Sequence, residues 1–205
     1  MKTPVHPLIH ERVGSDDTLH FCSRFSGRES FLRDHGGMMP GVFLLEMACA
    51  AEACFRRRDV KGLLNVVWPE PLIVGDRNGE VTVRLDLGES GNGFSISTTD
   101  PLVVHCQGIL ANEWKPEIGA SVHSLADIQS RCPSILNQGD CDVLMQSTHG
   151  PSLMSIVSLR HNTQEALAEI VMPLSGSVDR SKSVLNPVML NGGLLSSVIL
   201  SLIQG

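Results

Sequence analysis

Apolar residues along this chain fall into short alternating runs on either side of one segment, residues 41–58, that is apolar at most positions. Because Pro40 precedes this segment and its apolar residues favour no single face, the pattern predicts a long buried helix surrounded by a sheet. Clusters of turn-forming residues separate the alternating runs, which is typical of strands joined by turns. The strands predicted in this first half are residues 18–26, 63–68, 80–87, 93–98 and 102–112. Strand, long helix and further antiparallel strands predict an α+β fold.

The second half repeats this order on a smaller scale. Residues 113–140 are polar and contain prolines and glycines, which predicts a linker with a short helix near 124–131. Strands are predicted at 153–160 and 165–172, and a second apolar helix over about 187–203. We therefore expect a first domain over 1–115, a linker over 116–140 and a second domain over 141–205.

Composition and charge narrow the range of functions. The chain has 205 residues and a formal net charge of −6 without a long basic run, so nucleic-acid binding has little support. Its six cysteines show no Cys-x-x-Cys pair and no metal-ligand spacing, and no apolar signal-peptide core follows Met1. Cys49 and Cys54 lie on the apolar helix and are expected to be buried. We expect a cytoplasmic protein with reduced thiols, without a membrane span.

The strongest chemical signal is His35, which precedes the glycine-rich turn that leads to Pro40 and the apolar helix. Backbone N–H groups at the start of a helix are unpaired and carry partial positive charge, so they can hold a carbonyl oxygen that gains negative charge. A nearby imidazole can take or give a proton close to neutral pH. This combination suits chemistry beside a thioester or ketone carbonyl, although a histidine before a helix also serves as a capping or core residue.

Five segments, in order through most of the chain, resemble the dehydratase domains of modular polyketide synthases. They are His6-Pro7-Leu8, Phe31 to His35 with Pro40-Gly41 and Leu45 to Ala48, Asn65 to Leu72, His149 to Leu153, and Asn186 to Asn191. The resemblance implies a double hotdog fold, in which each half wraps an antiparallel sheet around a long central helix. It also implies an acyl substrate on the phosphopantetheine arm of an acyl carrier protein, neighbouring synthase domains, a homodimer, and no metal or nucleotide cofactor.

The chain departs from the family pattern at several positions. Asn191 stands where the family has an aspartate that helps water to leave, and Leu195 stands where a glutamine or histidine usually follows it. His149 replaces a tyrosine. The step from His35 to Pro40 is shorter than in the family, and strands expected after the second helix are absent up to Gly205, so we expect residues to be missing at both places.

An asparagine cannot act as a proton donor with an adjustable pKa, which makes dehydration by the usual route doubtful. The resemblance then points to the relatives with asparagine at this position, the enoyl isomerases that shift a double bond. The open alternatives are an active dehydratase, a pyran-forming cyclase, or an inactive domain that only docks the carrier. The predicted catalytic residues are His35 and Asn191, and the predicted substrate-binding residues are Gly37, Met39, Pro40, His149 and Leu195.

Overall fold

The computed structural model describes residues 6–13, 19–75, 81–88, 92–113, 123–145, 150–172 and 183–204. The chain divides into two compact units. The first unit comprises residues 1–115 together with 177–186, and the second comprises residues 116–176 together with 187–205. The short segment 177–186 therefore belongs to the first unit although it follows most of the second unit in sequence.

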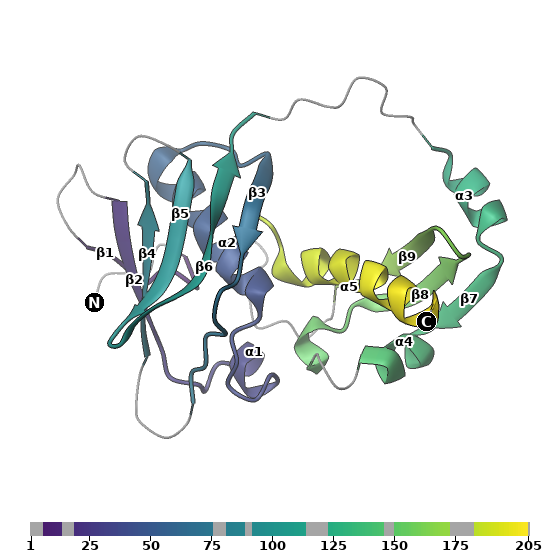
Figure 1. Ribbon diagram of the computed structural model, residues 1–205, viewed down its shortest axis with the longest axis horizontal. Coiled ribbons are helices and arrows are strands. Elements are labelled where there is room, and N and C mark those ends of the chain that lie inside the picture. Colours follow the sequence, from purple (N-terminus) through teal and green to yellow (C-terminus); the bar gives the residue numbers. More distant parts are fainter. Residues whose placement is uncertain are drawn as a thin grey trace. The chain divides into compact units, whose positions relative to one another are not determined.

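The first unit contains a six-stranded sheet in the order β1-β2-β4-β5-β6-β3, and every neighbouring pair is antiparallel (Figure 1). Alternating apolar residues of its strands, among them Phe21, Val83 and Ile96, are buried on one face, as the period of two requires. The strands are β1 (Glu11–Val13), β2 (Leu19–Phe25), β3 (Gly62–Val67), β4 (Val81–Leu87), β5 (Gly93–Thr99) and β6 (Leu102–Ala111). The bounds of β2 to β6 agree with the five strands predicted from the sequence, whereas β1 was not predicted.

The central helix α2 (Gly41–Ala51) packs against β4 and β6 and continues as a π-helix, η1 (Glu52–Arg56). Every residue from Val42 to Ala51 is buried, which explains why its apolar residues occupy all faces of the helix. The helix ends at Arg57, whose φ of +54° is left-handed and stops the helical hydrogen bonding. The sheet around a long helix confirms the α+β class and the hotdog-type arrangement.

The second unit has a three-stranded antiparallel sheet in the order β7-β8-β9, with the long helix α5 (Pro187–Gln204) packed against β8 and β9. Its other elements are α3 (Leu125–Arg131), β7 (Ser134–Asn137), α4 (Gln138–Met145), η2 (Pro151–Leu153), β8 (Ile156–His161) and β9 (Ala166–Ile170). Part of the expected linker 116–140 is therefore structured, because β7 pairs with β8 along its whole length. The two predicted strands and the second predicted helix are present.

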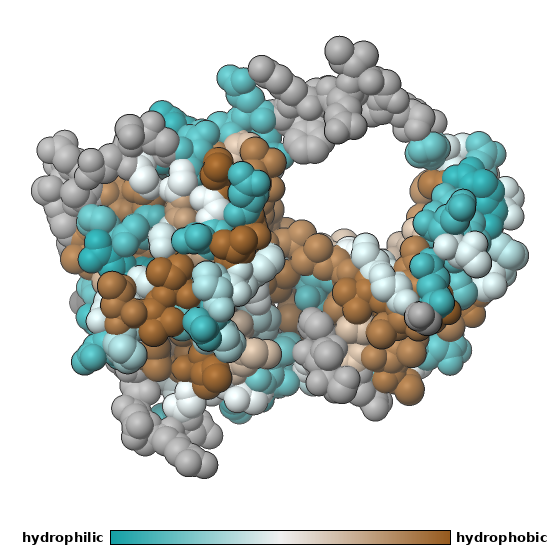
Figure 2. Space-filling view, in the orientation of Figure 1, coloured by the Kyte–Doolittle hydropathy of each residue, from teal (hydrophilic) through white to brown (hydrophobic). Residues whose placement is uncertain are grey.

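The core of the second unit is smaller than that of the first. It consists of Cys141, Met145, Ile156, Leu159, Leu195 and Ile199. On its other side α5 exposes Leu194, Val198 and Leu202. Figure 2 shows hydrophobic surface along this helix. By length and composition α5 alone, among the helices of the described residues, is apolar enough to cross a membrane, a test that a soluble core helix also passes.

The six cysteines are free, and their environments differ. Cys49 is buried as expected, but Cys54, which lies on η1, is exposed, contrary to the prediction. Burial raises the pKa of Cys49 to about 12, with the carboxylates of Glu46 and Glu52 adding to the effect. Burial also raises the pKa of Cys106 to about 12.

Cys49 and Cys106 should therefore resist thiolate-specific alkylation in the folded protein at pH 8, because both burial and the raised pKa keep them as thiols. Iodoacetamide labelling followed by peptide mass spectrometry should show Cys54 modified first, and Cys49 and Cys106 modified only after denaturation. Rapid labelling of Cys49 in the native protein would contradict the enclosure of α2 by the sheet.

Candidate active site

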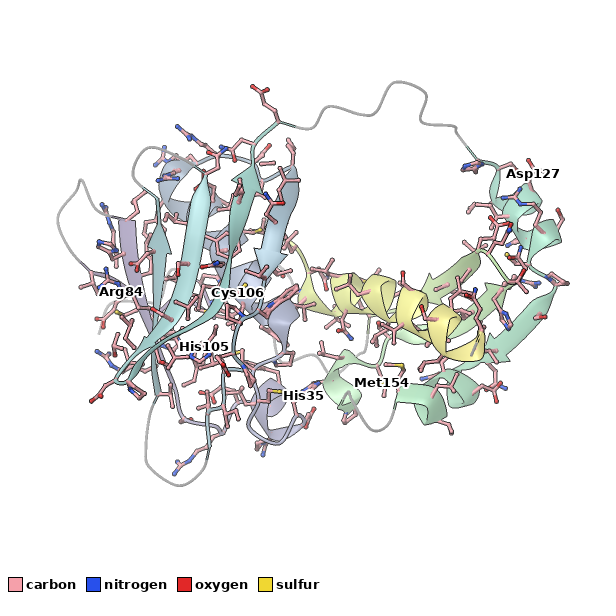
Figure 3. The ribbon with its side chains drawn as sticks, viewed as in Figure 1. His35, Arg84, His105, Cys106, Asp127 and Met154 are labelled. Carbon is pink, nitrogen blue, oxygen red and sulfur yellow. The ribbon has the colours of Figure 1, made fainter. Side chains whose placement is uncertain are left out.

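His35 lies in the turn that follows the short helix α1 (Ser30–Arg33), and it is half-buried (Figure 3). The turn is held in place by Phe31, whose ring stacks on Phe43 of α2 with the centroids 4.4 Å apart. His35 Nδ1 donates a hydrogen bond to the carbonyl oxygen of Phe31 at 2.7 Å. In the neutral imidazole this places the hydrogen on Nδ1 and the lone pair on Nε2, which is then the basic nitrogen.

Two glycines after His35 allow the chain to reverse. Gly36 and Gly37 have φ of +62° and +83°, in the left-handed region that glycine adopts without strain. A Cβ on Gly37 would lie 2.8 Å from the carbonyl oxygen of Val74, so the backbones approach too closely for any side chain. The Gly37 carbonyl accepts the N–H of Val74 at 2.7 Å, and Met39 N–H donates to Leu72 O at 2.8 Å. These bonds close the short step from His35 to Pro40, which is continuous in the structure.

The N–H groups of this turn are occupied. The N–H of Gly37 donates to Leu32 O at 2.8 Å, and the N–H of Met38 donates to His35 O at 3.1 Å. Gly37 therefore contributes its backbone conformation and its carbonyl. The donors that remain for an oxyanion are the first N–H groups of α2, at Gly41 and Val42, which no carbonyl of the helix itself can accept.

Trp68 packs over this start of α2, which the sequence analysis did not foresee. A Cβ on Gly41 would lie 2.8 Å from Trp68 Nε1, so only glycine lets the indole approach this closely. Trp68 is 47% exposed, while the predicted binding residues Met39 and Pro40 are buried. The sequence signal was a glycine, Gly41, at the first position of a helix that otherwise has only bulky residues in its first turn.

Asn191 lies in the first turns of α5 and is 4% exposed. Its side-chain nitrogen donates a hydrogen bond to the carbonyl oxygen of Leu153, in η2, at 3.3 Å. The next residue, Gly192, lies against Ser155 and Ile170, where a Cβ would be 2.6 Å from Ser155 Oγ and 2.9 Å from Ile170 Cγ2. This close contact fixes the position of Asn191 relative to β9 within the second unit.

Two other predicted residues belong to the second half of the chain. Leu195, one turn after Asn191, is 4% exposed and packs in the core cluster of the second unit. His149 lies outside the described residues. His35 and Asn191 belong to different units, and the structure gives the geometry of each within its own unit. The predicted site roles remain predictions.

Glu46 is a further residue that the sequence analysis passed over. Its side chain is 0% exposed in the middle of α2, and its carboxylate accepts hydrogen bonds from the backbone N–H groups of Val184 and Leu185. The available signal was a single acidic residue in a helix that is otherwise apolar all round, since such a charge needs a partner when it is buried.

His105 differs from His35 in its surroundings. It is 5% exposed, its Nδ1 lies 3.1 Å from Glu70 O, and its Nε2 lies 3.2 Å from Thr98 Oγ1. Both ring nitrogens are therefore used inside the first unit, which is typical of a structural histidine.

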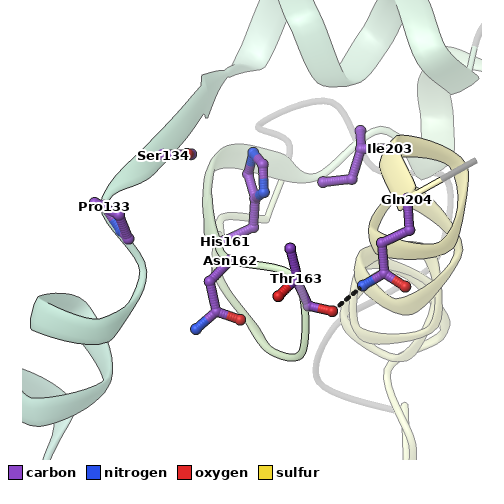
Figure 4. A pocket seen from close by; sticks show the side chains of 7 residues that line it. All are labelled: Pro133, Ser134, His161, Asn162, Thr163, Ile203 and Gln204. Atoms are coloured by element: carbon purple, nitrogen blue, oxygen red, sulfur yellow. Dashed lines mark hydrogen bonds between the residues drawn. The ribbon is translucent and has the colours of Figure 1, made fainter.

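Within the described part of the chain, neither a metal site nor the surface cavity of the second unit coincides with these residues. Among the described residues, no group of three or more His, Cys, Asp or Glu side chains could hold a metal ion. A cavity of about 570 Å³ opens on the second unit between the start of β7, the β8–β9 turn and the end of α5 (Figure 4). Neither Asn191 nor Leu195 lines it, and Gln204 Nε2 donates across its edge to Thr163 O at 2.7 Å.

Comparison with known proteins connects this geometry to a family. Residues 6–99 match the family model described as polyketide synthase dehydratase domain. The pyran synthase domain from module nine of the sorangicin pathway is 31% identical, with a TM-score of 0.77, over 97% of this chain and 74% of that chain. A trans-AT PKS dehydratase domain from Brevibacillus brevis is 30% identical, with a TM-score of 0.77, over 95% of this chain and 74% of that chain.

Curated relatives are far longer proteins. Polyketide synthase PksN of Bacillus subtilis (strain 168) is 29% identical over 218 residues, which cover 98% of this chain and 4% of PksN. Polyketide synthase PksL of the same organism is 29% identical over 213 residues, covering 97% of this chain and 5% of PksL. The chain therefore spans only a small part of the length of these relatives.

Gly37→Ala should destabilise the folded protein by about 2 kcal/mol or more, because alanine is strained in the left-handed conformation and its Cβ would clash with the carbonyl oxygen of Val74. Gly36→Ala is the matched control: its φ is also positive, but nothing lies within 4 Å of the added Cβ, so we expect about 1 kcal/mol. Urea denaturation of both variants measures the difference. Equal destabilisation would contradict the close approach of Gly37 to Val74.

Asn191→Asp should lose more stability at pH 8 than at pH 4. Burial raises the pKa of an introduced carboxyl, and only its protonated form can donate to Leu153 O as the amide does. A group whose pKa is higher in the folded than in the unfolded state loses its contribution as the pH rises, so the variant should approach the wild type in acid and fall behind by about 1–3 kcal/mol at pH 8. Melting temperatures of both proteins from pH 4 to 8 give the comparison, and a difference independent of pH would contradict it.

Proposed function

The chain belongs to the polyketide synthase dehydratase family, and on that premise we propose that it is an enoyl isomerase. It would shift the α,β double bond of a carrier-bound acyl thioester to the β,γ position. The observation that carries this proposal is the buried amide of Asn191, which donates to a backbone carbonyl at the position where the resemblance places the acid of a dehydratase. An amide supplies no proton to a leaving hydroxyl, so a reaction that expels no water fits these residues better.

His35 would be the base that this reaction needs. Its Nδ1–H is held by Phe31 O, so Nε2 carries the lone pair that removes the γ-proton of the 2-enoyl thioester. The electrons of the broken C–H bond form the β,γ double bond, and those of the α,β double bond form a double bond between the α-carbon and the carbonyl carbon. The π electrons of the carbonyl pass to the thioester oxygen. The imidazolium then returns the proton to the α-carbon, and the carbonyl re-forms, so atoms and charge balance without a cofactor in the cycle.

The negative oxygen of the dienolate needs hydrogen-bond donors. The N–H groups of Gly41 and Val42 at the start of α2 suit this role, because they have no acceptor within the helix and lie at its positive end. Trp68 packs over the same end and would shield it from water. Asn191 would act as a neutral hydrogen-bonding group that helps to position the acyl chain.

The molecular setting is part of the proposal. The chain matches segments of large synthases, which supports an acyl carrier protein with its phosphopantetheine arm as the bearer of the substrate and neighbouring synthase domains as partners. The expected homodimer and the cytoplasmic location stay predictions.

A second candidate is a pyran-forming cyclase, which the 31% identity to a pyran synthase domain favours. In that reaction a hydroxyl of the same chain adds to the β-carbon of the enoyl thioester. His35 would take the hydroxyl proton and return a proton to the α-carbon. A single base again suffices, so the substrate distinguishes the two functions.

Incubation of the protein with a carrier-bound 2-enoyl thioester in deuterated water should give the β,γ-unsaturated isomer, with deuterium at the α- and γ-carbons. His35→Ala should abolish exchange at both carbons together, because one imidazole serves both. His161→Ala, a histidine of the second unit that lies outside the proposed mechanism, is the control and should keep the activity. Mass spectrometry and NMR of the released acyl chain measure the label.

Three results would decide against the isomerase. The first is efficient loss of water from a 3-hydroxyacyl thioester by the wild type, which would show a dehydratase. The second is ring closure of a hydroxyl-bearing enoyl thioester without double-bond shift, which would show the cyclase. The third is full γ-exchange in His35→Ala, which would remove His35 as the base.

A further inference from the structure

Glu46 and Glu52 are both 0% exposed, and the proposed reaction uses neither; Glu46 alone lies within α2. It lies in the middle of α2, is 0% exposed, and is surrounded along the helix by apolar side chains. A buried carboxylate is strongly unfavourable unless hydrogen bonds replace the water that it has lost. Its retention in this helix therefore depends on the partners that it finds.

Those partners come mainly from one short segment far away in sequence. Glu46 Oε1 accepts the N–H of Val184 at 2.7 Å and the hydroxyl of Ser183 at 3.0 Å, and Oε2 accepts the N–H of Leu185 at 2.6 Å. His6 Nε2 lies 3.2 Å from Oε1 without the geometry of a hydrogen bond, and its Nδ1 accepts the N–H of Leu8 at 3.2 Å. Both carboxylate oxygens are thus satisfied by short, charge-assisted bonds.

The anchored segment is itself a closed turn. Ser183 Oγ, which donates to Glu46, also accepts the N–H of Asn186 at 3.1 Å. Asn186 has a φ of +52°, a left-handed conformation that asparagine tolerates better than most residues. The next residue, Pro187, is the first of α5, where proline is favoured. The segment held by Glu46 therefore ends at the residue before the helix that carries Asn191.

We propose that Glu46 is a positioning residue: its carboxylate fixes residues 183–186 to α2 within the first unit, and so sets the conformation of the chain that leads into α5. Four residues, Pro187 to Leu190, follow this anchored turn before Asn191. The catalytic consequence rests on the proposed function, but the anchor itself does not. Glu46 has no role as an acid or base, because both of its oxygens are engaged and it is closed to solvent.

Amide hydrogen exchange of the whole chain tests the anchor directly. Glu46→Gln keeps the size of the side chain but sets an NH₂ group against one of the backbone donors, so the amides of Val184 and Leu185 should exchange about 10-fold faster. Glu52→Gln is the matched control. Glu52 is also 0% exposed and follows α2 directly, but its carboxylate binds Arg56 at 3.2 Å. That variant should leave the exchange of Val184 and Leu185 unchanged.

Turnover distinguishes positioning from simple stabilisation. With whichever acyl thioester reaction the wild type performs, Glu46→Gln should lower kcat about 10-fold at saturating substrate, with the pH profile unchanged in shape and midpoint. Glu52→Gln, compared at equal loss of melting temperature, should keep its kcat. Ser183→Ala removes one of the bonds to Glu46 and should give a smaller loss of the same kind, and it serves as the second variant if Glu46→Gln does not fold.

Unchanged exchange at Val184 and Leu185 in Glu46→Gln, or in Ser183→Ala if it alone folds, would overturn the anchor. A changed pH profile would show that Glu46 itself titrates in the reaction, and an equal loss of kcat in Glu52→Gln would reduce its role to stability; either result overturns positioning. If the wild-type protein shifts no double bond, only the proposed function is overturned. Hydrogen exchange still decides whether Glu46 holds residues 183–186 in place.

Discussion

The enclosure of α2 is the constraint on which the rest of the first unit depends. A helix whose residues from Val42 to Ala51 are all buried must be covered on every side, and the curled sheet supplies most of that cover. The same enclosure brings Phe43 under Phe31 and so seats the turn that carries His35. It also makes it energetically unfavourable to leave Glu46, the single charged residue of α2, unpaired. The carboxylate of Glu46 is paired with a segment that lies more than a hundred residues away in sequence.

In the turn that carries His35, the hydrogen bonds of the backbone N–H groups fix the conformation. Around His35 almost every N–H is committed to turn or ladder bonds, so the flexible-looking glycine turn is in fact tightly specified by Gly36 and Gly37. The uncommitted donors lie one step further along, where Pro40 ends the turn and α2 starts. The proposed base and the proposed oxyanion donors thus lie on elements that pack against or belong to one buried helix, α2.

Much of this could be predicted from the sequence. The alternating runs gave the strands of the first unit, because a half-buried antiparallel sheet imposes a period of two, and the segment after Pro40 gave α2. The pattern did less well for short elements. β7 (Ser134–Asn137) lies in the stretch predicted as a linker from its polar residues, prolines and glycines, and only its pairing with β8 shows it to be a strand. Cys54 was predicted to be buried on the apolar helix, but it is exposed on η1.

The site was partly predictable for a related reason. His35 and Asn191 stand out through motifs, whereas Glu46 and Trp68 acquire meaning only from contacts across the fold. No pattern along the chain links Glu46 to Val184 and Leu185. The donors of these hydrogen bonds are backbone N–H groups, so they cannot be recognised from the residue types of the segment. The close packing of Trp68 on Gly41 is equally invisible until the backbone path is known.

The bond from His35 to the carbonyl of Phe31 has a consequence for how such domains diverge. In the proposed function, the group that orients the base is part of the main chain, and substitution of a side chain cannot delete it. Replacement of the residue at position 191, which lies in the other unit, leaves this hydrogen bond in place. Under the proposal, a change of reaction can therefore arise in one half of the chain while the other half keeps its base oriented.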